Sequence, residues 1–148
     1  MSVRKTFVSL LHEEMRENDN IVFVVGDLGY GHFDEIREEF PDRVINPGAA
    51  EQLMMGMSIG LAQEGKLVVC YSMTPFTLYR PFEFIRNYVD YEKIPVKLVG
   101  AVLVRDPKVG RSGVKDDVEA LSATGPSVVL AGVLISATCI VLGLRPPA

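Results

Sequence analysis

The stretch INPGAAEQLMMGMSIGLAQEGKLVVCYS (residues 45–72) decides the fold. Pro47-Gly48 precedes a run of apolar and helix-forming residues over 49–64, and Gly65 ends that run, as glycine commonly does at helix C-termini. The run that follows, 66–72, has the length and β-branched content of a buried strand. A helix joined by a short turn to a buried strand predicts one half of a parallel α/β unit.

The same alternation continues on both sides of this stretch. An amphipathic N-terminal helix is predicted, then strands and helices that alternate in the order strand 21–26, helix about 32–39, strand 43–46, helix 49–64, strand 66–72, helix about 76–91 and strand 96–104. Short apolar strands separated by helices indicate a parallel sheet that is covered on both faces. The predicted fold class is therefore α/β, a three-layer sandwich with a mostly parallel sheet.

Composition limits the classes of protein that the chain can belong to. Its 148 residues suit a single domain, 1–148, and 48% hydrophobic with 23% charged residues indicates a globular protein. A net charge of −4 without a basic stripe argues against a nucleic-acid partner. Cys70 and Cys139 both lie in apolar runs and are interpreted as reduced, buried thiols, which predicts a cytoplasmic location.

The sequence changes character after residue 104, so residues 105–148 are interpreted as an atypical or divergent tail of the same domain. A short helix is predicted at 116–123. The uncharged apolar run 127–144 has 18 residues, the lower limit for a membrane span. Its Val and Ile content, with Gly132 and Gly143, favours two buried strands, and membrane attachment remains the alternative.

Glu51 is the first candidate for a functional side chain. In the first turn of its predicted helix a carboxylate would complement the helix dipole, by about 0.3–1 kcal/mol, and this structural role is sufficient by itself. However, Gly56 and Gly60 each cost about 1 kcal/mol relative to alanine inside a helix, which suggests a closely packed neighbour. The helix is apolar nearly all round, so we expect it to be buried on every side. An unpaired carboxylate there would have a raised pKa, as suits a proton donor.

Two further segments are candidates. VVGDLGYGHF (24–33) runs from a strand through a glycine-rich turn, where either a plain turn or a phosphate site is possible, and Asp27 lies where ligands bind in open α/β sheets. The segment 71–91 holds four Tyr and three Phe, and can form a core helix or a wall on which a flat ring stacks. Neither His12 nor His32 has a second ligand at metal-binding spacing.

Taken together, these pieces resemble one family. FPDRVINPGAAEQLMMGMSIGLAQEGKLVVCYSMTPFTLYRPFEFIRN (40–87) is similar to the pyrimidine-binding domain of transketolase-like thiamin diphosphate enzymes, with a specific Arg-x-x-Asn-x-Gly-x-x-Glu-Gln core. The resemblance covers residues 1 to about 101. It is strongest to the separate C-terminal half of split, two-subunit transketolases, and weaker to 1-deoxyxylulose-phosphate synthases and 2-oxoacid dehydrogenase beta subunits.

The resemblance implies roles for individual residues. The family glutamate that Glu51 matches hydrogen-bonds ring nitrogen N1′ of the cofactor's aminopyrimidine and so assists removal of the thiazolium C2 proton. Phe76 matches the aromatic residue that stacks on the pyrimidine, with Tyr79 and Phe82 as further walls. Arg80 matches an arginine near the substrate pocket.

It also implies partners. Asp27 matches a family aspartate near the cofactor and the subunit interface, and the Gly56/Gly60 helix would pack across a homodimer interface. The diphosphate-binding domain and its magnesium motif are absent from this sequence. Thiamin diphosphate would therefore be shared with a diphosphate-binding partner subunit, which would hold Mg²⁺, and the substrates would be sugar phosphates.

The tail departs from the family pattern. Family members continue with a Gly-x-Thr-His motif, whereas RDPKVGRSGVKDDVEAL (105–121) contains no histidine. A divergent, frame-shifted or truncated tail would each give this difference. Two other functions therefore stay open: an inactive module that only folds and dimerises, and a subunit of the 2-oxoacid dehydrogenase beta or deoxyxylulose-phosphate synthase type.

Overall fold

The computed structural model describes residues 3–105 and 114–119, and five strands form a single sheet. In spatial order these are β2 (Val44–Ile45), β1 (Ile21–Val25), β3 (Leu67–Met73), β4 (Val96–Arg105) and β5 (Val114–Glu119). The first four are mutually parallel, and β5 runs antiparallel to β4. The predicted α/β fold with a mostly parallel sheet is confirmed.

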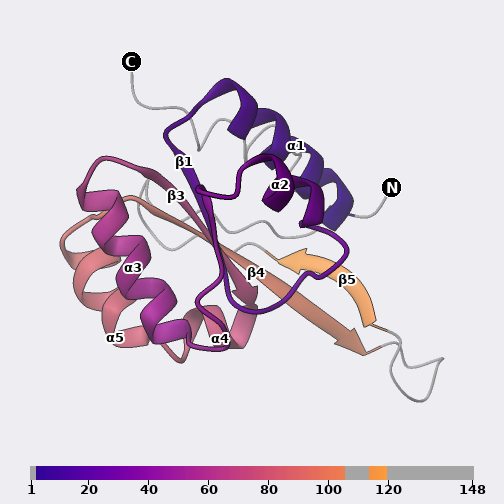
Figure 1. Ribbon diagram of the computed structural model, residues 1–148. Coiled ribbons are helices and arrows are strands. Elements are labelled where there is room, and N and C mark those ends of the chain that lie inside the picture. The colour runs from indigo at the N-terminus through magenta and orange to yellow at the C-terminus, as the bar shows by residue number, and fades with distance from the viewer. Residues whose placement is uncertain (1–2, 106–113, 120–148) are drawn as a thin grey trace.

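Helices cover both faces of this sheet (Figure 1). One face carries α1 (Val3–Glu17) and α2 (Asp34–Glu39). The other carries α3 (Glu51–Gln63), α4 (Thr74–Leu78), α5 (Phe82–Phe84) and the π-helix η1 (Ile85–Tyr91). The sheet is thus the middle layer of the predicted three.

Each face has its own core because neighbouring strand residues point to opposite sides. Phe23 and Tyr71 pack with Phe33 beneath α1 and α2, with ring centroids 4.9–6.2 Å apart. Val24 and Cys70, one position before or after them along the strands, instead pack against α3. One core is therefore aromatic and the other is aliphatic and methionine-rich.

Two of the predicted helices differ from the structure. The helix predicted over 76–91 is interrupted at residues 79–81, between α4 and the contiguous α5 and η1, because Pro81 has no backbone N–H to continue a helix. The helix predicted at 116–123 overlaps β5, whose residues pair with Gly100–Arg105 along the free edge of β4. These ladder hydrogen bonds prevail over the weak helical preference of a short polar segment.

The tail predictions can be compared with the structure only in part. The two strands predicted in 127–144 lie outside the described residues, as do residues 120–123 of the wrongly predicted helix. Within 3–105 and 114–119, every helix is too short or too polar to span a membrane.

The expectation that the helix 49–64 is buried on every side is wrong for this chain. Met54, Met55 and Ile59 face the sheet and are buried, but Leu53 on the outer side is 55% exposed. A Cβ at Gly56 would meet only the Phe84 ring, at 3.5 Å, and one at Gly60 would meet nothing within 4 Å among the described residues. Within residues 3–105 and 114–119, the outer side of α3 is left open.

Candidate functional site

Glu51 is the first residue of α3, as the sequence predicts, and its side chain is only 3% exposed. The preceding turn is formed by Asn46 and Gly48: the Asn46 Oδ1 accepts a hydrogen bond from the Gly48 N–H at 2.9 Å, and Gly48 has φ +82°. Glycine adopts this left-handed conformation at little cost. The turn directs the chain into α3 so that a carboxylate lies buried at the start of the helix.

Arg80 binds this carboxylate. Its Nη1 donates to Glu51 Oε2 at 2.7 Å, and the same guanidinium lies over the Phe76 ring, with Cζ 3.8 Å from the ring centroid. Unlike Glu51, the Arg80 side chain is 48% exposed. The structure thus brings together three of the predicted site residues, Glu51, Phe76 and Arg80, as one cluster that we call the Glu51 cluster.

The short helix α4 positions Phe76. Pro75 lies in its first turn, where the missing N–H is not needed. Thr74 Oγ1 donates to the Ala101 carbonyl of β4 at 3.2 Å, and Gly100 allows this close approach because a Cβ there would collide with Thr74. Arg80 follows α4, and its backbone carbonyl accepts a 3.4 Å hydrogen bond from Gln52 of α3. The aromatic ring and the guanidinium are therefore anchored to both β4 and α3.

A hollow of about 460 Å³ opens beside this cluster. It is lined by Ala49, Ala50, Glu51, Gln52, Leu53 and Arg80. A buried carboxylate oxygen and an aromatic face approached at 3.8 Å by a planar group are the two contacts that a flat nitrogen heterocycle needs. Phe76 does not line the hollow itself, so the Glu51 cluster fits an aminopyrimidine ring at the place that the Arg80 guanidinium takes beside it.

Asp27 lies in a strained turn at the end of β1, with φ +46°. Its carboxylate accepts a short hydrogen bond from the Tyr30 hydroxyl, which raises the pKa of Tyr30. Its backbone N–H reaches Asn46 Oδ1 at 3.2 Å. Asn46 thus links the turn after β1 to the turn before α3, and Asp27 is next to the Glu51 turn without lining the hollow.

The glycine-rich turn uses its own N–H groups. Gly31 N–H donates to Asp34 Oδ2 at 3.0 Å, and His32 and Phe33 N–H both donate to the Gly29 carbonyl. A phosphate cradle requires N–H groups that point at the anion. Of the two interpretations that the sequence leaves open for residues 24–33, the geometry favours the plain turn.

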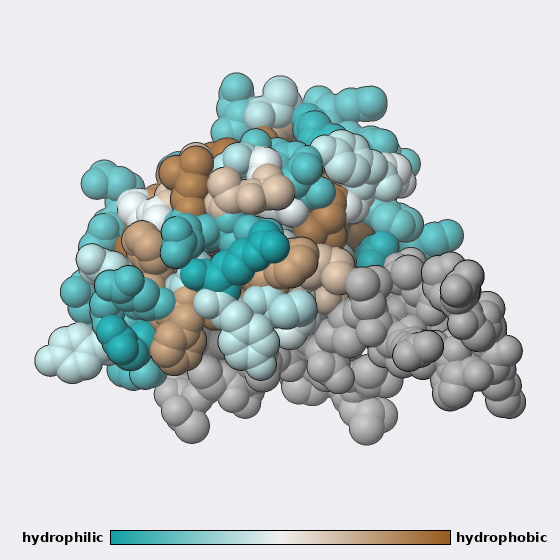
Figure 2. All heavy atoms as spheres, turned by 90° about the horizontal axis from the view of Figure 1, so that it is seen from below, coloured by the Kyte–Doolittle hydropathy of each residue, from teal (hydrophilic) through white to brown (hydrophobic). Residues whose placement is uncertain are grey.

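Tyr79 and Phe82 are 76% and 57% exposed, and neither lines the 460 Å³ hollow. Sequence reasoning missed Asn46 and Gln52 as individual residues. Both lie inside the Asn-x-Gly-x-x-Glu-Gln spacing, which was the available signal. Viewed from below, the molecule shows brown apolar groups interspersed with teal polar ones (Figure 2).

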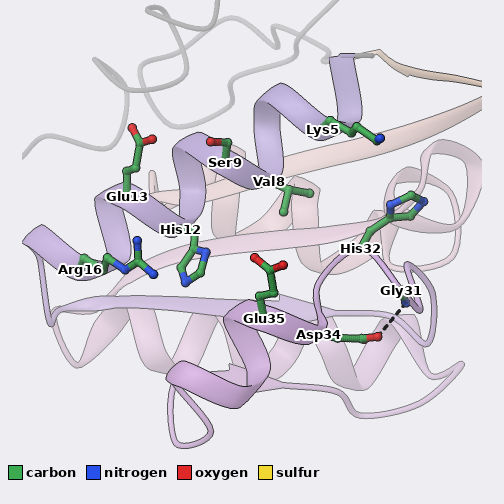
Figure 3. A pocket seen from close by; sticks show the side chains of 10 residues that line it. All are labelled: Lys5, Val8, Ser9, His12, Glu13, Arg16, Gly31, His32, Asp34 and Glu35. Atoms are coloured by element: carbon green, nitrogen blue, oxygen red, sulfur yellow. Dashed lines mark hydrogen bonds between the residues drawn. The ribbon is translucent and has the colours of Figure 1, made fainter. Parts of the chain in front are cut away.

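A second hollow, about 590 Å³, lies between α1 and the α2 region, away from Glu51. Figure 3 shows His12 on α1 and His32 in the turn before α2 among its lining side chains. His12 Nε2 lies 2.8 Å from Glu39, and Arg16 binds the same carboxylate through two hydrogen bonds of 2.6 and 2.7 Å. Arg16 chiefly, then His12, holds the pKa of Glu39 at about 2. In the described part of the chain, no three His, Cys, Asp or Glu side chains gather as a metal site.

Comparison with known protein families gives one match over most of the chain. Residues 1–121 match the family model described as the transketolase pyrimidine-binding domain. A protein of Methanocaldococcus jannaschii named putative transketolase C-terminal section is 41% identical over 98 residues, which are 66% of this chain and 31% of that protein. The 6-deoxy-6-sulfo-D-fructose transketolase subunit SqwH of a Clostridium species is 34% identical over 100 residues, 67% of this chain and 31% of that subunit.

A solved structure gives the same result. It is described as a split gene transketolase, inactive beta4 tetramer, and it matches with a TM-score of 0.61 and 34% identity over 66% of this chain and 33% of its own. The chain thus spans about a third of the length of these relatives.

Proposed function

Since the chain belongs to the transketolase pyrimidine-binding domain family, we propose that it is the pyrimidine-binding module of a split transketolase-type enzyme. The reaction is the transfer of a two-carbon ketol unit between sugar phosphates. The single observation that carries this proposal is the buried Glu51 carboxylate, held at the start of α3 beside the Phe76 ring.

Membership of this family implies dependence on thiamin diphosphate. When bound, this cofactor supplies the electron sink that ketol transfer requires. Glu51 would hold a proton at ring nitrogen N1′, because its oxygen is buried next to the hollow. Phe76 would stack on the ring, and Tyr79 would lie near it. Arg80, at the mouth of the hollow, would bind the anionic or hydroxylated end of the sugar substrate.

The diphosphate and Mg²⁺ belong to a partner subunit in this proposal. The N–H groups of residues 31–33 in the turn after β1 bind acceptors within that turn and α2, which supports this division. Asp27 would lie near the cofactor at the interface. The open outer side of α3, with Leu53 and Gly60, is the surface for a homodimer contact.

One comparison bears on the choice between an inactive module and a partner-dependent subunit. The related solved structure is described as inactive in its beta4 form. An assembly made from one kind of subunit that lacks activity fits a module that requires a different subunit. A cytoplasmic location is also proposed, since Cys70 is a free, fully buried thiol on β3.

The test is reconstitution. The chain is prepared alone and with a diphosphate-binding subunit of a split transketolase, and ketol transfer is assayed with thiamin diphosphate and Mg²⁺. We expect activity only in the pair, and Glu51→Gln should lower it at least about 100-fold, the scale of a lost proton-transfer partner. Glu39→Gln, a matched change in the Arg16-bound carboxylate, is the control. Equal activity of the Glu51→Gln and Glu39→Gln pairs would contradict the proposal.

A further inference from the structure

We infer that Arg80 occupies the binding position of the cofactor's pyrimidine ring and must leave it before the ring can bind. This inference rests on the proposed function. It concerns a single side chain that makes both of the contacts proposed for the ring, one to Glu51 and one to Phe76.

The guanidinium of Arg80 and an aminopyrimidine ring have the same shape and similar hydrogen-bonding edges. A guanidinium is planar, carries N–H donors at its edge and stacks on aromatic faces. An aminopyrimidine is also planar, with a ring nitrogen and an amino group at its edge. Arg80 places one edge nitrogen 2.7 Å from Glu51 Oε2 and its plane centre 3.8 Å from the Phe76 centroid. Two planar groups cannot both lie against the same side of Phe76 and the same carboxylate oxygen, so they compete.

The cluster is built so that Arg80 can move while its partners stay. Glu51 is 3% exposed and fixed in α3, whereas the Arg80 side chain is 48% exposed. The Arg80 backbone is held by Gln52 at its carbonyl and followed by Pro81, so rotation of the side chain alone releases Glu51. The guanidinium then remains tethered at the mouth of the hollow, where the proposed substrate contact requires it.

In this structure Arg80 therefore takes the place of the ring. It satisfies the buried Glu51 carboxylate, which would otherwise be left without its cationic partner, and it covers the apolar face of Phe76. Both contacts must be broken when the ring binds. Weakening them should strengthen ring binding, which is the opposite of what loss of a ring-binding residue would cause.

The test uses the full chain and 4-amino-2,5-dimethylpyrimidine, a probe without phosphate or thiazolium that needs neither Mg²⁺ nor a partner. Binding is followed by calorimetry for wild type, Arg80→Gln and Arg86→Gln. The glutamine in the first variant keeps a hydrogen-bond donor but loses the charge and most of the stacking. We expect Arg80→Gln to bind roughly fivefold to thirtyfold more tightly, since a half-exposed ion pair and a cation–π contact are each modest. Arg86→Gln, an exposed arginine bonded to Asn87, should not differ from wild type.

A second measurement observes Arg80 directly. In wild type, the Nε–Hε NMR signal of Arg80 should shift as the probe saturates the chain, and that of Arg86 should stay in place. Glu51→Gln should abolish binding in both the wild-type and the Arg80→Gln background.

The outcomes separate the two proposals. Unchanged or weaker binding by Arg80→Gln, or an unmoved Arg80 signal, with binding still lost in Glu51→Gln, would overturn the role of Arg80 and leave the proposed function standing. No binding by any variant up to the solubility limit of the probe would overturn the role of Arg80, and inactivity of the reconstituted pair would overturn the proposed function.

Discussion

The molecule contains two carboxylate–arginine pairs with nearly equal shortest distances and very different surroundings. Glu51 and Arg80 lie 2.7 Å apart, and Glu39 and Arg16 lie 2.6 Å apart. The Glu51 side chain is 3% exposed and that of Glu39 is 38% exposed. Glu39 has a second donor, His12, whereas Arg80 is the only side-chain donor to Glu51 among the described residues.

An aromatic ring accompanies each pair as well. Phe76 lies under the same guanidinium that binds Glu51, while Phe40 lies under Arg43 and makes an edge contact with His12. The second set joins α1 to the C-terminal end of α2 and spreads its charges over several partners. The first set concentrates a buried acid, a planar cation and a ring at one hollow. Short distances occur in both places, so burial and shared contacts distinguish the candidate site from a surface bridge.

Stability should show the largest difference between the two regions. Arg80→Ala leaves the buried Glu51 carboxylate without its cationic partner, and we expect the free energy of unfolding to fall by about 1–3 kcal/mol. Arg16→Ala should have a smaller effect, because solvent reaches Glu39 and His12 still binds it. Urea denaturation at pH 7 measures both. An Arg16 variant less stable than the Arg80 variant would break the comparison.

Replacing the aromatic ring of each region, Phe76 or Phe40, should give a smaller difference, which is measured as the affinity for thiamin diphosphate. Phe76→Leu keeps apolar volume but removes the stacking face, so thiamin diphosphate should bind the reconstituted pair about three- to tenfold more weakly, the scale of one aromatic contact. Phe40→Leu, the matched change in the other region, should leave the dissociation constant unaltered. Titration of the cofactor, followed by circular dichroism, gives both constants, and equal losses would show that Phe76 has no special contact.

The smallest expected effect is the pH dependence of stability that comes from the exposed pair of Glu39 and Arg16. The pKa of Glu39 is lowered from 4.5 to about 2, mainly by Arg16, so the folded state binds this proton less readily than the unfolded chain. The pair's contribution to stability is therefore complete above about pH 4.5 and is lost as the pH falls through about 2.

This predicts that Glu39→Gln is less stable than wild type at pH 7 and that the difference shrinks between about pH 4.5 and 2. The urea midpoints of both proteins at several pH values measure it. A difference that stays constant across that range would mean that the carboxylate is not stabilised by Arg16 and His12 in solution.

Sequence reasoning predicted the layers and most elements because the strands are short apolar runs and the helices between them have clear ends. Glu51 was singled out by its place in an apolar helix, and Phe76 and Arg80 were identified through the resemblance. Their direct contact was not, since Arg80 is 29 positions from Glu51 and no periodic pattern links two residues so far apart. The strand β5 was missed for a different reason: its sequence, VKDDVE, has four charged residues in six and therefore lacks the apolar run that predicts a strand.

The open side of α3 could not be predicted from the sequence either. An apolar, glycine-containing helix predicts burial, but a single chain's sequence does not say whether the covering surface belongs to that chain or to another. Here Leu53 and Gly60 have no cover within the described residues, while Met54 and Met55 are fully buried.

A crystal structure of the chain with its diphosphate-binding partner and thiamin diphosphate would test the central claim most directly. The account predicts that N1′ of the pyrimidine lies within hydrogen-bond distance of Glu51, that Phe76 stacks on the ring, and that the Arg80 guanidinium has left both. A ring bound elsewhere, with Arg80 still at its present 2.7 Å from Glu51, would contradict it.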